Sequence, residues 1–315
     1  MGRVMIAYLF PGQGAQTPDF LHRLGGADPH PAIRKTLDEA SEALGLNVLT
    51  LDTATALAST VAVQVTLVVA GVAAARALAD EGIAPHAVAG LSVGAYGAAV
   101  MAGAIEFPAA LRLVQLRAQL MENACPHGYG MLAVLGLDER EMTRAIDESG
   151  AAVWIGNLNA PRQIVLSGSD DALSMLRDLV LMRGARKAER LAVSVPSHCV
   201  LMEDASARLI DAARTVRVDA PRIPYVGNRG ARVLRSADAV RDDLATNLRY
   251  PVRWHDSTVA LSELGMKVFV EMPPGRTLTS LAADALPEAA SIAMEAGSVA
   301  SAAARVRAAC RQRQD

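Results

Sequence analysis

The segment GLSVG at residues 90–94 constrains the fold of this chain more than any other stretch. It follows a short apolar run at residues 86–89, which predicts a strand, and precedes a small-residue stretch at residues 95–104, which predicts a helix. A G-x-S-x-G pattern in this setting is typical of a sharp turn that lifts the serine hydroxyl above a sheet edge. Ser92 is therefore a candidate nucleophile, and the helix start behind it offers N–H groups to an oxyanion. The plainer interpretation is a tight glycine turn in which Ser92 only caps the helix.

Other segments place this turn in a larger parallel sheet. Residues 5–10 (MIAYLF) form a short apolar run bounded by turn residues, as expected of a buried parallel strand. Residues 56–79 are rich in Ala, Val and Leu and predict a long buried helix, while residues 223–226 and 268–271 predict further strands. Hydrophobic residues make up 51% of the chain but aromatic residues only 3%, so Ala, Val and Leu must build the core. The pattern predicts an α/β domain with a central, mainly parallel sheet.

A different pattern begins at residue 129. Strand-like and helical segments follow in the order β-α-β-β-α-β, with Asp138 and Glu141 predicted to cap the first helix and a last strand expected over residues 186–193. This order is typical of a ferredoxin-like subdomain, and parallel-strand and helix patterns resume after it. We therefore expect a discontinuous large α/β domain, residues 1–128 and 196–315, with an inserted ferredoxin-like α+β subdomain, residues 129–195.

Charge and cysteine content exclude several classes of site. Lys and Arg total 31 and Asp and Glu total 33, so the net charge of -2 leaves no basic surplus for nucleic acid. Three cysteines without C-x-x-C spacing argue against a disulfide framework and a zinc knuckle, and no metal site is expected. The loop PGQG at residues 11–14 can bring Gln13 near a ligand. It lacks the Lys of a P-loop, so ATP or dinucleotide binding is not supported.

The distribution of apolar residues predicts a soluble, cytoplasmic protein that binds no membrane. The N-terminal apolar run ends in Pro-Gly rather than in a small-residue cleavage site, which is unlike a signal peptide. The most apolar stretch, residues 67–75, is far shorter than the roughly 20 residues of a membrane span.

A serine nucleophile needs a base, and the chain has six histidines. His198 directly follows the last strand of the inserted unit in the segment SVPSH, whereas His255 lies on a predicted helix. Sequence order alone does not choose between them, because the same catalytic geometry occurs with different chain orders.

Arg117 lies on the apolar face of a predicted helix. That helix starts near Pro108 and carries Leu113, Leu116 and Leu120 as an i, i+3, i+7 stripe, within which Arg117 falls. A guanidinium on an apolar face is costly unless an anion meets it. The anion is either an internal Asp or Glu in a structural salt bridge, or a substrate carboxylate held by a bidentate clamp.

Eight segments together resemble the malonyl-CoA:acyl-carrier-protein transacylase family. Their shared order and spacing extend from Tyr8 to about Leu281. The segments are LFPGQGAQ (9–16), Gln64, GLSVGAY (90–96), LRAQLM (116–121), NLNAP (157–161), SVPSHCVLM (194–202), YPVRW (250–254) and PPGRTLTSL (273–281). The resemblance implies a large hydrolase-like domain with a ferredoxin-like subdomain, in agreement with the patterns above.

The resemblance also implies a role for each matching position. No cofactor is bound; the substrate is malonyl-CoA and the acceptor is a phosphopantetheine-type arm on a small acyl carrier protein. The implied roles are Ser92 as the acylated nucleophile, His198 as its base, the backbone N–H groups of Gln13 and Val93 as the oxyanion hole, Arg117 with Gln64 nearby as the site of the malonyl carboxylate, and the backbone carbonyl of Tyr250 as the group that orients His198.

Two positions depart from the family pattern. Leu91 stands where the family usually has His, and Ala95 stands where it usually has an acid. An elbow of this type is similar to that of the epsilon subunit of biotin-independent malonate decarboxylase. That subunit loads malonyl onto a carrier subunit with a phosphoribosyl-dephospho-CoA arm, and we take this as the main interpretation. It implies other malonate decarboxylase subunits as partners.

Three alternatives remain open. Within the family, the chain could be a stand-alone transacylase of fatty-acid or polyketide synthesis. A plain α/β-hydrolase, an esterase or thioesterase, would share the serine motif and use an Asp with a late histidine such as His255. A subunit that only docks a carrier protein would need no catalysis, although Ser92, His198 and Arg117 are all present.

Overall fold

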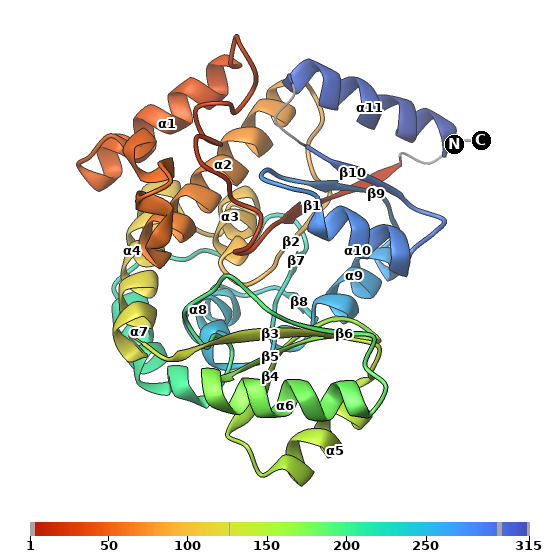
Figure 1. Cartoon of the computed structure of the whole chain (residues 1–315). Coiled ribbons are helices and arrows are strands. Elements are labelled where there is room, and N and C mark those ends of the chain that lie inside the picture. Colours follow the sequence, from red (N-terminus) through yellow and green to blue (C-terminus); the bar gives the residue numbers. More distant parts are fainter. Residues whose placement is uncertain (1–3, 126, 295–297, 314–315) are drawn as a thin grey trace.

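A computed structural model describes residues 4–125, 127–294 and 298–313 and arranges their strands in two sheets (Figure 1). The larger sheet has six strands in the order β10-β9-β1-β2-β7-β8. Its strands are β1 (Met5–Phe10), β2 (Ala87–Gly90), β7 (Tyr225–Val226), β8 (Val233–Leu234), β9 (Met266–Glu271) and β10 (Ala290–Ala293). All neighbouring pairs are parallel except β7 and β8. The predicted mainly parallel α/β sheet is therefore confirmed.

Strand β1 lies at the centre because both of its faces are apolar. Tyr8 and Phe10 contribute to one buried cluster and Ala7 and Leu9 to another, so helices cover both sides of the sheet. The helices of the large part of the chain are α1 (Pro31–Leu44), α2 (Thr60–Asp80), α3 (Gly94–Met101), α4 (Phe107–Ala124), α7 (Glu203–Arg214), α8 (Ala237–Thr246), α9 (Trp254–Glu263), α10 (Thr277–Ala285) and α11 (Val299–Gln312).

Helix α2 is long and apolar enough to cross a membrane by length and composition alone. It has 21 residues, more than the nine-residue stretch that stands out in the sequence. However, 89% of its most apolar window is buried inside the fold, against α1, α3 and α4. This burial is that of a core helix.

The smaller sheet is antiparallel, with the order β4-β5-β3-β6. Its elements are β3 (Tyr129–Leu135), α5 (Glu139–Ser149), β4 (Val153–Ala160), β5 (Gln163–Ser169), α6 (Asp170–Met182) and β6 (Lys187–Arg190). The β-α-β-β-α-β order and the Asp138–Glu141 capping box are as predicted. Strand β6 is shorter than expected, because residues 191–194 leave the sheet. The boundaries of the two units at residues 128/129 and 195/196 stay predictions.

Figure 1 shows α5 and α6 on the face of the small sheet that is turned away from the large one. Apolar residues at alternate positions of β3 and β5 explain this placement, because Leu132, Val134, Ile164 and Leu166 share a buried cluster with both helices. The opposite face of the small sheet is therefore left to meet the large domain.

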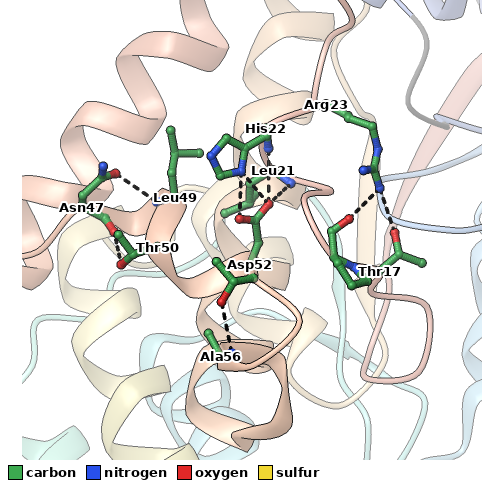
Figure 2. A network of polar contacts seen from close by, with 11 residues as sticks. Thr17, Leu21, His22, Arg23, Asn47, Leu49, Thr50, Asp52 and Ala56 are labelled. Carbon is green, nitrogen blue, oxygen red and sulfur yellow. Dashed lines mark hydrogen bonds and ion pairs between the residues drawn. The ribbon is translucent and has the colours of Figure 1, made fainter.

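The buried carboxylate of Asp52 binds the chain segment around Leu21 and His22, which follows β1 (Figure 2). Asp52 is fully buried and accepts hydrogen bonds from the backbone N–H groups of Leu21, at 2.8 Å, and His22, at 3.3 Å. The His22 ring lies 2.9 Å from the same carboxylate. Asp19, His22 and Asp52 offer ligand atoms within 4.8 Å of one another, where the sequence predicts no metal site. The hydrogen bonds to Asp52 account for its burial without an ion.

Candidate active site

The nucleophile turn is held by close backbone packing at two glycines. Strand β2 ends at Gly90 and helix α3 begins at Gly94, and Ser92 between them has φ 56°, a left-handed conformation that is rare outside glycine. A Cβ on Gly90 would lie 2.1 Å from the Gly94 carbonyl carbon, and one on Gly94 would lie 2.2 Å from the Phe10 carbonyl oxygen. Only glycine fits at both positions, which is why this strand, turn and helix can meet so tightly.

His198 is the histidine that meets the serine. Its Nε2 lies 2.8 Å from Ser92 Oγ, and the residue is 2% exposed with φ 66°. His255, the alternative, lies on α9 and does not line the pocket that contains Ser92. The geometry therefore favours His198 and gives no support to the hydrolase arrangement with His255.

The carbonyl of Asn247 orients the His198 ring. It lies 2.7 Å from Nδ1, and because a carbonyl can only accept, Nδ1 carries the proton and Nε2 is free to accept from Ser92. The resemblance assigned this role to Tyr250, so the assignment is corrected to Asn247 as the principal acceptor. Asn247 begins the 3-10 turn Asn247–Arg249, whose first carbonyl faces His198. The Tyr250 carbonyl makes a smaller contribution, which raises the pKa of His198.

The imidazole is held neutral by its surroundings. Burial lowers the pKa of His198 to about 4, with the Arg117 charge as the next cause, while the carbonyls of Asn247 and Tyr250 oppose the shift. Among the residues described by the structure, no carboxylate forms an ion pair with His198. Ser92 and His198 are thus a dyad completed by a backbone carbonyl rather than by an acid.

Arg117 is a buried cation surrounded by neutral oxygens. It is fully buried on α4, and its terminal nitrogens donate to Gln64 Oε1 at 2.5 Å, Ser92 Oγ at 3.1 Å and Asn247 Oδ1 at 3.3 Å. Within residues 4–125, 127–294 and 298–313 no carboxylate pairs with it, and its Nε has no hydrogen-bond partner. Burial lowers the pKa of Arg117 to about 10, so it stays charged at neutral pH. Of the two anions considered for Arg117, an internal Asp or Glu in a salt bridge is therefore absent from the described part of the chain.

Gln64 links Arg117 to the loop after β1. Its Oε1 accepts from Arg117, while its Nε2 donates to Gln13 Oε1 at 3.2 Å. Neither the Gln13 nor the Val93 backbone N–H donates a hydrogen bond within the described part of the chain. Val93 directly follows Ser92 and Gln13 lines the same pocket as Ser92, so both amides can serve an oxyanion.

A pocket of about 420 Å³ opens over Ser92 and His198. The large domain contributes the loop at residues 11–16, Leu91, Thr277 and Leu278. The small sheet contributes Met131, Ala133, Asn157, Asn159, Gln163 and Val165 from the face that its helices leave bare. Asn159 Oδ1 is buried without a partner in the described chain. The pocket thus lies between the two units, with three side-chain amides on one wall.

Sequence reasoning missed Asn228 and Asn247. Asn228 Oδ1 accepts from the Ser92 N–H at 2.9 Å, and the Asn247 side chain reaches both Arg117 and the Ser92 carbonyl, the latter at 3.4 Å. Asn228 in turn donates its backbone N–H to the buried Asp243. Burial raises the pKa of the Asp243 carboxyl to about 6. No local motif marks these residues, because each acts on a turn more than 130 positions away.

Comparisons with known proteins agree with this geometry. The model of the acyl transferase domain family matches residues 7–308. The chain is 37% identical over 282 residues to the malonyl CoA-acyl carrier protein transacylase of Escherichia coli strain K12, covering 87% of this chain and 91% of that protein. A malonyl CoA-acyl carrier protein transacylase structure from Coxiella burnetii superposes with a TM-score of 0.91 at 32% identity, covering 98% of each chain. A malonyl-transacylase solved in complex with a type II polyketide acyl-carrier protein gives 0.89 at 36%, covering 96% of this chain and 99% of that one.

The environment of His198 predicts an unusually low pKa for its imidazole. We expect its Cε1 proton resonance to titrate with a midpoint near pH 4, rather than near 6.5, because burial and Arg117 disfavour the imidazolium. Arg117→Gln should raise the midpoint while leaving it below 6.5, since burial is the larger cause. The folded chain binds this proton more weakly than the unfolded chain, so His198 also lowers stability as pH falls from 6.5 towards 4. A midpoint at or above 6.5 in the parent chain would contradict this description.

Proposed function

Because this chain belongs to the acyl transferase family, which includes malonyl CoA-acyl carrier protein transacylases, we propose that it moves malonyl groups from malonyl-CoA to the thiol of an acyl carrier protein. It is an acyltransferase. One observation carries the proposal: Ser92 Oγ lies between a neutral imidazole at 2.8 Å and a buried guanidinium at 3.1 Å, at the base of a pocket. A base and a carboxylate-binding group thus meet at one nucleophile.

The first half-reaction acylates Ser92. His198 Nε2 takes the hydroxyl proton as Oγ attacks the thioester carbonyl, and the N–H groups of Gln13 and Val93 stabilise the oxyanion, each by about 3 kcal/mol in comparable enzymes. The C–S bond then breaks. The CoA sulfur leaves with the proton that His198 returns, and the malonyl group stays on Ser92 as an ester.

The second half-reaction reverses these roles with a new thiol. The carrier thiol gives its proton to His198 and attacks the ester carbonyl, and Ser92 Oγ leaves and regains that proton. The same groups therefore serve both directions, as a ping-pong transfer requires.

Arg117 provides a reason for malonyl specificity. The guanidinium is fully buried, and its bond to Ser92 Oγ is the one that an arriving acyl carboxylate would replace. A carboxylate there would give the buried cation the anion that it lacks, whereas an acetyl group would leave it unpaired. Gln64 and Asn247 hold the guanidinium ready for this exchange.

The amide wall of the small sheet suits the arm that both thiols share. Pantetheine carries two amide groups on an otherwise largely apolar chain, and this wall combines the amides of Asn157, Asn159 and Gln163 with the apolar side chains of Met131 and Val165. We propose that the arm lies against it, with Asn159 Oδ1 accepting one of its N–H groups.

The acceptor separates two versions of this function. Relatives named malonyl CoA-acyl carrier protein transacylases, one of them in polyketide biosynthesis and one solved with a type II polyketide acyl-carrier protein, favour a stand-alone transacylase that serves a phosphopantetheine carrier. The malonyl transferase subunit of malonate decarboxylase is the second candidate, favoured by Leu91 and Ala95 in the serine elbow. Leu91 lines the pocket, so its difference from the family pattern changes the pocket wall. Ala95 is fully buried, so its difference changes the packing behind the serine turn.

Intact mass measured after brief incubation with malonyl-CoA tests the chemistry. We expect a malonyl adduct that maps to Ser92, is absent in Ser92→Ala, and disappears when a carrier thiol is added. Acetyl-CoA in a parallel sample should give little adduct. Free malonate accumulating without any dependence on a carrier would identify a hydrolase instead, and no adduct with no turnover would favour a docking subunit.

The malonyl preference should depend on Arg117. Arg117→Ala is expected to lower the malonyl-over-acetyl ratio of kcat/KM about 100-fold, since a bidentate charged contact is worth about 3 kcal/mol. Arg112→Ala, an exposed arginine on the same helix, is the matched control and should leave the ratio unchanged. An unchanged ratio in Arg117→Ala would show that another group binds the carboxylate.

Competition between two carriers decides the pathway. Malonyl-loaded protein is offered equal amounts of a phosphopantetheine carrier and of a carrier with a phosphoribosyl-dephospho-CoA arm. We expect faster transfer to the phosphopantetheine carrier. Preference for the second carrier would establish the malonate decarboxylase version.

A further inference from the structure

We propose that Asn228 is a positioning residue that holds the strained serine turn in the geometry needed for acylation. Asn228 follows β7 and is 3% exposed. Its Oδ1 accepts from the Ser92 N–H at 2.9 Å, and its Nδ2 donates to the Gly90 carbonyl at 3.0 Å. One amide therefore bridges the end of the strand and the nucleophile. The inference rests on the proposed acyl transfer at Ser92.

The turn needs an outside support because its own hydrogen bonds are not enough. Gly94 N donates to the Leu91 carbonyl at 3.0 Å and Ala95 N donates to the Ser92 carbonyl at 3.1 Å, and both bonds only continue the turn into α3. Neither engages the Ser92 N–H. Ser92 has φ 56°, a conformation that persists in a non-glycine residue only where the surroundings impose it.

Asn228 is itself fixed by a buried carboxylate that the mechanism does not use. Its backbone N–H donates to Asp243 Oδ1 at 2.8 Å, and the Tyr225 hydroxyl donates to Asp243 Oδ2 at 2.9 Å. Asp243 lies on α8 and is 6% exposed. Tyr225 of β7 and Asp243 of α8 thus hold the backbone of Asn228 in place, which fixes the position from which its side-chain amide reaches the turn.

The bridge has two chemical consequences. It keeps the Ser92 N–H occupied, so that the N–H groups left for an oxyanion are those of Val93 and Gln13. It also sets the direction of Oγ, which must stay 2.8 Å from His198 Nε2 for proton transfer.

The test compares Asn228→Ala and Asn228→Asp with Ser206→Ala as the matched control. Ser206 is fully buried on α7 and donates to the Ala245 carbonyl at 3.1 Å, so the control also loses one buried hydrogen bond. Four quantities are measured on the full chain. They are the maximal rate and half-saturating concentration of acylation by malonyl-CoA, the rate of Ser92 labelling by phenylmethanesulfonyl fluoride, and the thermal unfolding midpoint.

We expect Asn228→Ala to lower the maximal acylation rate and the labelling rate about 100-fold, the loss typical of a misplacement near 1 Å, with little change in the half-saturating concentration. Asn228→Asp keeps an acceptor for the Ser92 N–H but sets a carboxylate oxygen against the Gly90 carbonyl, so its rates should also fall. Ser206→Ala should keep the parent rates. If Asn228→Ala fails to fold, Asn228→Asp against Ser206→Ala carries the comparison.

Two outcomes would overturn the proposal. One is a parent-like maximal rate in the Asn228 variants, and the other is a loss of rate that simply follows the unfolding midpoint across all three variants. The sulfonyl fluoride keeps this test separate from the proposed function. If the parent is labelled but not acylated by malonyl-CoA, the transacylase proposal fails, while the labelling rates of the variants still decide the role of Asn228.

Discussion

The fit of glycines around Phe10 is the constraint on which the rest of the site depends. Phe10 ends β1, and a Cβ on Gly71 of α2 or Gly97 of α3 would lie within 2.9 Å of its ring. A Cβ on Gly94 would meet its carbonyl oxygen. Two helices and a strand can therefore approach one another closely at this point. The strand leads to Gln13, α2 carries Gln64 and α3 begins behind Ser92, so one packing arrangement fixes the relative places of the three.

Electrostatics at the base of the pocket follow from this packing. Among the residues that the structure describes, Arg117 is buried beside Ser92 and His198 with only neutral oxygens as partners, although a buried cation without an anion costs several kcal/mol. The cost is offset in part by Gln64 and Asn247, which point their carbonyl oxygens at it. Buried arginines are normally paired with an anion, and the proposed binding of the acyl carboxylate would supply one to Arg117.

Local sequence patterns predict most of the fold, together with Ser92 and Arg117 as site residues. The other residues of the site meet them only through tertiary contacts. The short apolar runs at residues 5–10 and 86–89 match β1 and β2, and the order of segments in the small unit matches the second sheet. Strands β8 and β10 are short edges with half-buried residues and leave no such pattern. Burial of Arg117 was readable from its apolar stripe. Asn228 and the Asn247 carbonyl were not, because only the folded chain brings them to residues 90–94.

The weak base explains how the proposed mechanism would favour transfer over hydrolysis. A carboxylate partner would raise the basicity of His198, whereas burial and Arg117 hold its pKa at about 4. A thiol has a pKa of about 8.5, so deprotonating it against such a base is uphill but accessible during attack. Water is a much weaker acid than a thiol and gains far less from the same base, whereas Ser92, also a weak acid, is held 2.8 Å from Nε2. A dyad oriented by the Asn247 carbonyl therefore suits an ester that must survive until a thiol arrives, and the cation that lowers the basicity of His198 is also the group that we propose holds the acyl carboxylate.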